Sequence, residues 1–239
     1  MMFILKNKLY FSVLYFSLLL LDIIVKLNFD NINFRFFSKP LMLILLFLFY
    51  IINNNEKSKN RRFYVIMALL FLLVGEMFVV YREVVTFLSF SIFCFTMVKI
   101  FYIFRFSNQN DFNLIRLLPI LSFCFLYILV LFNLIYDNLD YFLIPVLLFL
   151  FLTMIIAQFV YLRKSEVDYR SYLLVAIGVT LSIVAETMAI LDIFYNTGFV
   201  KENAILILLY SISHYLIILG LVTEKIQVEN KDNLSVFED

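Results

Sequence analysis

The sequence predicts an all-α integral membrane protein, built as a bundle of about eight transmembrane helices. Of its 239 residues, 64% are apolar and 15% are charged, whereas an ordinary soluble domain is roughly 45–50% apolar and about 25% charged. The apolar stretches are long and continuous, without the alternating pattern of membrane β-barrel strands. Each approaches the roughly 20 residues that a helix needs to cross a bilayer. This composition excludes a soluble enzyme and a secreted domain.

Eight stretches have the composition of a spanning helix, and short polar connections separate them. They predict a single transmembrane domain over residues 1–222, followed by a polar, disordered cytoplasmic tail over residues 223–239. In chain order the expected spans are Leu9–Val25, Phe36–Ile52, Phe63–Tyr81, Val85–Phe104, Leu114–Ile135, Tyr141–Leu162, Ser171–Tyr195 and Asn203–Val222.

The second span has the shortest uninterrupted apolar part. This part, Pro40–Ile52, has 13 residues, a length that also fits a re-entrant segment. Pro40 suits the first turn of a helix, where a backbone N–H is not needed. The residues themselves therefore leave seven and eight crossings open.

The distribution of Lys and Arg predicts that the N- and C-termini are cytoplasmic. With eight crossings, the end of the bundle that holds the N-terminus carries 12 of the 19 basic residues and the other end carries 5. Basic loops stay on the cytoplasmic side of a membrane. With seven crossings the split is 13 to 4 and only the C-terminus lies inside. We expect a multi-pass protein, located in the cell (inner) membrane if the source is bacterial.

Residue usage argues against several kinds of partner and cofactor. The 19 Lys and Arg are balanced by 18 Asp and Glu, which leaves no basic excess for nucleic acid. One His and two Cys cannot supply a His/Cys zinc site, and both Cys94 and Cys124 lie in apolar runs. No Gly-rich phosphate loop is present. We therefore expect no metal and no organic cofactor, and membrane lipid as the main partner.

Ionisable side chains inside a membrane are costly and therefore point to function. Lys99, Arg116 and Asp192 are near enough to helix ends to reach the surface by snorkelling, which predicts a structural role for them. Asp22 and Lys39 lie near the same end of the first two spans. They can form an ion pair with each other, or Lys39 can hold an anionic headgroup.

Glu76 and Glu186 differ from these residues because neither reaches water along its own helix. With eight spans, both fall in the outer half of the bundle among apolar and small neighbours. Two carboxylates in one dry cavity should not both be ionised, so one is expected to hold a proton. A proton donor beside an acceptor is the usual arrangement for acid–base catalysis. The alternative is that each Glu hydrogen-bonds a different neighbouring helix and only holds the bundle together.

The two Glu segments show a faint internal similarity. Each Glu follows a small residue, and the next span carries a basic residue close to tyrosine: Lys99 with Tyr102, and His214 with Tyr210. Parallel repeats occur in membrane proteins, with functional sites at their interface. Ser211 lies three residues before His214 on one helical face, but no G-x-S-x-G motif supports a Ser–His nucleophile. We expect His214 to make an interhelical hydrogen bond.

The order of these features resembles the lysoplasmalogenase-like family of multi-spanning membrane proteins, also called YhhN-like. Lys39-Pro40 matches the Lys-Pro pair that opens the second span in that family. Gly75, Tyr102 and Tyr210 match its motifs in the third, fourth and eighth spans.

At five other motif positions the chain carries a different residue. Glu76 and Glu186 stand where the family has Asp, and Ala185 stands where it has Ser. Lys99 stands where it has His, and His214 where it has Gln. Both acidic positions thus keep a carboxylate on a side chain that is longer by one methylene.

The resemblance implies an eight-span fold and a hydrolase that cleaves the vinyl ether bond of lysoplasmalogens, or of a related single-chain lipid. It implies Glu76 and Glu186 as the acid and base, in unknown order, with no cofactor. It also implies a set of supporting residues around a lysophospholipid substrate, which are Lys39, Lys99, Tyr102, Tyr210 and His214.

Two other functions fit the same residues. Buried carboxylates also serve proton relays in transporters and can belong to a lipid-binding protein. A diverged member can also keep its fold as a non-catalytic sensor or assembly subunit.

Overall fold

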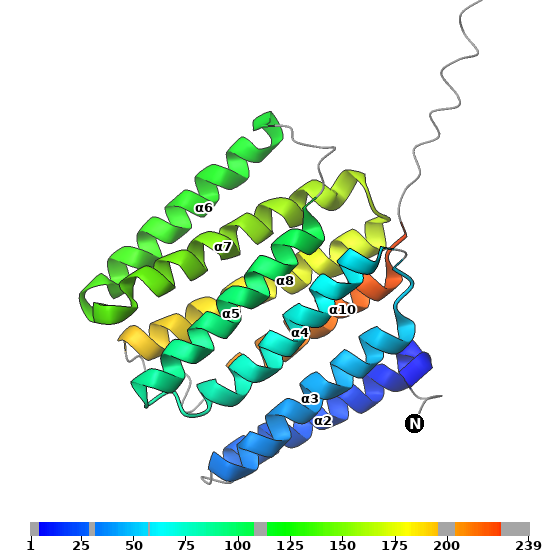
Figure 1. Ribbon diagram of the computed structural model, residues 1–239, viewed down its shortest axis with the longest axis horizontal. Coiled ribbons are helices and arrows are strands. Elements are labelled where there is room, and N and C mark those ends of the chain that lie inside the picture. The colour runs from blue at the N-terminus through cyan, green and yellow to red at the C-terminus, as the bar shows by residue number, and fades with distance from the viewer. Residues whose placement is uncertain (1–4, 29–31, 57, 108–113, 196–203, 226–239) are drawn as a thin grey trace, which may run out of the picture.

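The computed structural model describes residues 5–28, 32–56, 58–107, 114–195 and 204–225. Eight long helices in these ranges run side by side along one common direction (Figure 1). Each coincides with one of the expected spans, so the predicted all-α membrane bundle is confirmed. The helices are α2 Lys8–Asn28, α3 Ile32–Asn53, α4 Lys59–Val79, α5 Val85–Phe106, α6 Leu114–Ile135, α7 Leu143–Leu162, α8 Tyr169–Tyr195 and α10 Ile205–Thr223; three 3-10 turns flank α7, namely η1 Tyr136–Asn138, η2 Asp140–Phe142 and η3 Arg163–Ser165.

The second span forms the full-length helix α3. Within the described residues, seven helices are long and apolar enough to cross a membrane, and α3 has the shorter apolar segment Lys39–Asn53. The whole of α3 has 22 residues, about 33 Å at a rise of 1.5 Å per residue, which matches a hydrocarbon core of about 30 Å. It lies along α2 for its whole length (Figure 1), unlike a re-entrant segment. Pro40 lies inside α3, not in its first turn as expected.

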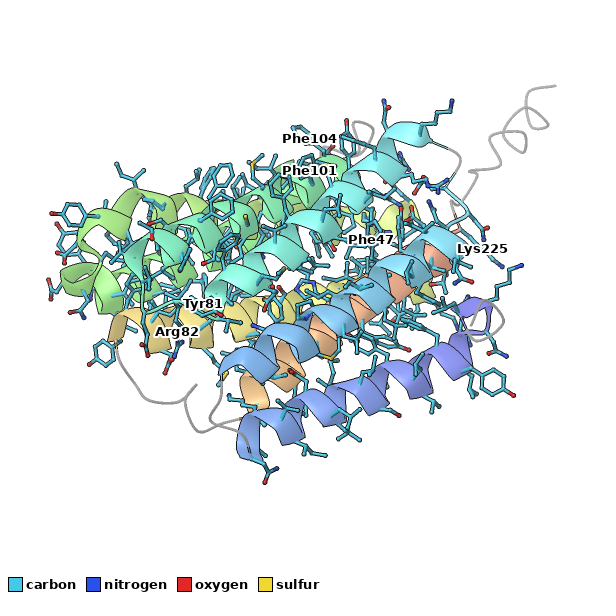
Figure 2. The ribbon with its side chains drawn as sticks, turned by 60° about the horizontal axis from the view of Figure 1, so that its bottom comes forward. Phe47, Tyr81, Arg82, Phe101, Phe104 and Lys225 are labelled. Carbon is cyan, nitrogen blue, oxygen red and sulfur yellow. The ribbon has the colours of Figure 1, made fainter. Side chains whose placement is uncertain are left out.

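Eight antiparallel passes bring the first and last described residues to one end of the bundle. The Asn53 amide at the end of α3 donates to the Leu5 carbonyl at 2.7 Å, and the Asp168 N–H donates to the Lys225 carbonyl at 3.1 Å. We call this end the basic end. Figure 2 shows Arg82 at the other end from Lys225. We call that end the outer end, after the orientation predicted from the basic residues.

Helices α8 and α10 pack closely because each presents a glycine to the other. A Cβ at Gly178 would lie 2.8 Å from the Ser213 carbonyl oxygen, and one at Gly220 would lie 2.6 Å from Cγ2 of Val175. The Ser171 hydroxyl also donates to the Gly220 carbonyl at 2.9 Å. This close approach fixes the relative position of the two helices that carry Glu186, Tyr210 and His214.

Helix α2 is attached to the bundle by one narrow stripe. Its buried residues are Phe11, Tyr15, Leu19 and Asp22, which recur every three or four positions. The Tyr15 hydroxyl donates to the Ser211 carbonyl at 2.9 Å, and the Phe11 ring stacks on Phe49 of α3. Asp22 therefore faces the interior of the bundle.

The outer surface of the helices is strongly apolar. Phe104 projects outward from α5 (Figure 2) and is 52% exposed, and Phe123 of α6 is 69% exposed. A soluble monomer rarely exposes contiguous apolar surface on this scale, so lipid tails are its natural solvent.

The packed part of the chain reaches past the expected boundary at residue 222. Thr223 ends α10, and Glu224 contacts two arginines at the basic end. The remaining residues of the predicted tail, 226–239, lie outside the described residues, as does the side chain of Arg116.

Candidate functional site

A cavity of about 380 Å³ lies inside the bundle, a size typical of small-ligand sites. Seven of the eight described helices line it, with α6 outside, and apolar side chains make up most of its wall. It reaches the outer end, where Lys26, Arg82 and Leu206 contribute to its wall. All the site residues predicted from the sequence line this one cavity, namely Lys39, Glu76, Lys99, Tyr102, Glu186, Tyr210 and His214.

The first carboxylate, Glu76 on α4, forms an ion pair with Lys39 of α3. The Glu76 side chain is 5% exposed and that of Lys39 is 17% exposed, and the hydroxyl of Tyr210 from α10 also bonds to Glu76. Gly75 lets α4 approach α5 here, because a Cβ on it would lie 3.1 Å from the Cys94 Cβ. Lys39 therefore pairs with Glu76, and the expected pairing of Lys39 with Asp22 is not what the structure has, although Asp22 lines the same cavity.

The second carboxylate, Glu186 on α8, forms an ion pair with Lys99 of α5. The Ser182 hydroxyl, one helical turn earlier, donates to Glu186 at 2.6 Å, and the Thr153 hydroxyl of α7 lies 3.4 Å from its other oxygen. The Lys99 ammonium also lies 5.2 Å from the centroid of the Phe149 ring. The expectation that Lys99 snorkels to the surface is wrong, because it turns into the bundle to meet Glu186.

Each of the two buried carboxylates has a lysine as its counter-ion, which the sequence did not predict. The two carboxylates do line one cavity, as expected. Each has its own lysine, however, so a positive charge from a neighbouring helix offsets the repulsion between the two carboxylates. Each carboxylate is also held in place by that partner.

His214 and Tyr102 line the same cavity, and their polar atoms have no hydrogen-bond partners among the described residues. The His214 side chain is buried, and neither ring nitrogen has a partner among the described residues. Its ring instead meets the Tyr210 ring edge-on, with 4.4 Å between the centroids. The interhelical hydrogen bond expected for His214 is therefore absent from the described structure, and no bond links it to Ser211. The buried Tyr102 hydroxyl likewise has no partner among those residues.

Polar contacts at the outer end and around Glu186 were not predicted. Arg82, in the connection after α4, binds Asp192 of α8 at 2.8 Å. Asp192 is therefore held by an ion pair instead of snorkelling. The supporting hydroxyls of Thr153 and Ser182 were also missed, although the spacing of four residues between Ser182 and Glu186 was a usable signal.

A second charged cluster closes the basic end. One Arg105 nitrogen contacts Glu56 and Glu224, at 2.6 Å each, and Arg163 contacts Glu224 at 2.9 Å. Burial lowers the pKa of Arg163 from its ordinary value to about 10, against the opposing effect of Glu224. The cluster ties together the ends of α5, α7 and α10. It involves residues that the sequence placed in separate loops and in the tail.

Metal ligation is not favoured by the grouping of side chains. No cluster of three or more His, Cys, Asp or Glu residues occurs in the part of the chain that the structure describes. The site instead offers two carboxylates, two ammonium groups, phenols and an imidazole, a set suited to proton transfer and hydrogen bonding.

Fold and site together define a multi-pass α-helical membrane protein whose bundle encloses a charged, apolar-walled cavity. The model of the YhhN family matches residues 34–221, which is most of the chain and includes every candidate site residue. The chain belongs to the YhhN family, and the resemblance stated from its motifs is confirmed. Neither curated proteins nor solved structures give a match.

Proposed function

We propose that the protein is a lysoplasmalogenase-like hydrolase that cleaves the vinyl ether bond of a single-chain ether lipid. The observation that carries the proposal is the one cavity lined by Glu76 and Glu186, each oriented by its own lysine. The rest of the wall is mainly apolar and fits an alkenyl chain. Membership of the YhhN family supports the same activity.

The reaction needs a proton on one carbon and water on the next. A proton adds to the alkenyl carbon β to the ether oxygen, and the positive charge left on the α-carbon is shared with that oxygen. Water attacks the α-carbon and gives up a proton to a base. The hemiacetal then breaks its bond to the glycerol oxygen, which takes a proton, and releases a fatty aldehyde and a glycerophospho-headgroup. One acid and one base suffice for these steps.

The surroundings of the two carboxylates indicate which one acts as the acid and which as the base. Glu186 faces donors from Lys99 and Ser182, which hold it as a hydrogen-bond acceptor. This suits the base that orients water and stabilises the cationic centre. Glu76 pairs with Lys39, which is 17% exposed against 9% for Lys99, so a proton can be resupplied more easily at Glu76. We therefore assign Glu76 as the acid.

Aldehyde release from a vinyl-ether lysophospholipid by the purified protein in detergent tests the proposal. Glu76→Gln and Glu186→Gln should each reduce the rate by at least about 100-fold, the usual contribution of one acid or base. Glu56→Gln is the matched control, because Glu56 is also paired with a buried arginine but lies at the basic end. Full hydrolysis by the Glu76→Gln, Glu186→Gln double variant would refute the assignment.

Two further measurements, of lysolipid binding and of lysolipid uptake, distinguish the competing functions. A folded wild-type protein that binds the lysolipid without releasing aldehyde would favour a lipid-binding or non-catalytic member of the fold. Proton-coupled uptake of the lipid into proteoliposomes, without breakdown, would favour a transporter.

A further inference from the structure

His214 and Tyr102 both line the cavity, and each lies about one helical turn farther from the outer end than a residue of the described site. His214 lies one helical turn past Tyr210 on α10, and Tyr102 lies one turn past Lys99 on α5. Both side chains line the cavity and are buried, with relative exposures of 4% and 3%. They lie farther from the outer end than Tyr210 and Lys99 on the same helices.

Three polar atoms of these residues are unpartnered within the described structure. They are Nδ1 and Nε2 of His214 and the Tyr102 hydroxyl oxygen. A buried polar atom without a hydrogen bond costs about 1–3 kcal/mol, and such atoms are rare in native proteins. Lys99 does not relieve this cost, because it is already paired with Glu186. The cavity is the direction from which a partner can come.

The chemistry of the two side chains selects the partner. A neutral imidazole offers one N–H donor and one acceptor nitrogen, and a phenol offers one donor and one acceptor. A carbonyl or carboxylate can only accept, and an ammonium can only donate. An O–H group does both and satisfies a donor and an acceptor at once. It also needs no counter-ion in an apolar surrounding.

We propose that His214 and Tyr102 form a hydrogen-bonding subsite that holds an O–H group next to the Lys99–Glu186 pair. The O–H belongs either to the water consumed in hydrolysis or to the free glycerol hydroxyl of a single-chain lipid. The two candidate sources of the O–H group rest on the proposed function. The subsite rests only on the unpartnered polar atoms of His214 and Tyr102. If the glycerol hydroxyl is the occupant, a second acyl chain is rejected here, because esterification removes the donor.

The single histidine in the chain makes the subsite directly observable. Protein labelled with ¹⁵N-histidine in detergent micelles gives the signals of the His214 ring alone. A hydrogen bond accepted by the unprotonated ring nitrogen moves its resonance to lower frequency. The probes are a lysophosphocholine with a saturated 1-O-alkyl chain, which has no vinyl ether to hydrolyse, and its 2-deoxy analogue, which lacks the glycerol hydroxyl.

The two sources give different results. A hydrogen-bonded ring in the lipid-free protein, unchanged by either lipid, identifies water. A shift that appears with the lysolipid and not with the 2-deoxy analogue identifies the glycerol hydroxyl. In that case His214→Phe should weaken lysolipid binding about five- to tenfold and leave the analogue unaffected, as expected for one hydrogen bond. A ring without a hydrogen bond in all three samples overturns the proposal.

Tyrosine variants test the second half of the subsite. Tyr102→Phe should alter the His214 signal in whichever sample shows the hydrogen bond. Tyr64→Phe is the matched control, because Tyr64 contacts Phe63 and Phe104 at the periphery and does not line the cavity. Equal effects of the two variants also overturn the proposal. Neither lipid probe needs to be hydrolysed for the His214 signal to respond. Absence of aldehyde release would therefore refute the proposed hydrolase, while the His214 signal would still decide whether the subsite exists.

Discussion

Replacing Lys99 with methionine leaves the Glu186 carboxylate buried without its ion-pair partner. Breaking a buried pair from one side costs about 3–5 kcal/mol. The Ser182 hydroxyl still donates to Glu186 at 2.6 Å, and a hydrogen bond to a charged group is worth about 1.5–3 kcal/mol. We therefore expect Lys99→Met to lower the free energy of unfolding by about 2 kcal/mol.

The reverse change should cost more. After Glu186→Met, the Lys99 ammonium keeps the face of the Phe149 ring, 5.2 Å from its centroid, and a cation–π contact contributes only about 0.5–2 kcal/mol. We expect a loss of about 3 kcal/mol for Glu186→Met. The double variant removes both charges and should lose about 2 kcal/mol, so the two single losses overlap by about 3 kcal/mol.

Reversible unfolding in mixed detergent micelles measures these free energies. The matched control is the Arg82–Asp192 pair, where Arg82 is 26% exposed, and its coupling should be about 1 kcal/mol or less. Additive losses at Lys99 and Glu186, or a larger loss for Lys99→Met than for Glu186→Met, would show that the ion pair does not hold the site as described.

Three further predictions concern the rest of the bundle. Gly178→Ala should lower stability in detergent by about 1–3 kcal/mol through overpacking, because the new Cβ meets the Ser213 carbonyl oxygen at 2.8 Å; an unchanged midpoint would contradict the close α8–α10 contact. Burial lowers the pKa of Arg163 to about 10, so between about pH 10 and pH 12.5 the unfolded chain binds more protons than the folded one. Wild-type stability should therefore rise with pH there relative to Arg163→Gln, and a constant difference would count against that shift. Finally, reporters fused to the N- and C-termini should both report the cytoplasm, whereas opposite sides would mean that α3 does not cross.

The pairing of each carboxylate with a lysine has a consequence for any chemistry at this site. Protonating Glu76 leaves the Lys39 charge unbalanced, and the same holds for Glu186 and Lys99. Proton movement is therefore coupled to the position of each ammonium group. Tyr210 links the Lys39–Glu76 pair to His214, since its hydroxyl bonds to Glu76 and its ring packs against the His214 ring.

The sequence alone determined the spans, because a helix in lipid must satisfy its own backbone and be about 20 apolar residues long. The eight long helices of the described residues were all found this way. The same reasoning singled out Glu76 and Glu186, since a charge that cannot reach water must face the interior of the bundle.

Only the tertiary structure decided which charges meet. Lys99 had two possible environments, water at the end of its helix or the interior, and its position in the sequence is compatible with both. From the sequence, Lys39 was expected to pair with Asp22 or to hold an anionic headgroup, whereas in the structure it pairs with Glu76 of α4. The unpartnered ring of His214 was likewise hidden, because a hydrogen bond depends on atoms within about 3 Å that come from other helices. Hydrophobicity is a property of each segment and can be read along the chain, whereas pairing depends on how segments distant in the chain are placed against one another.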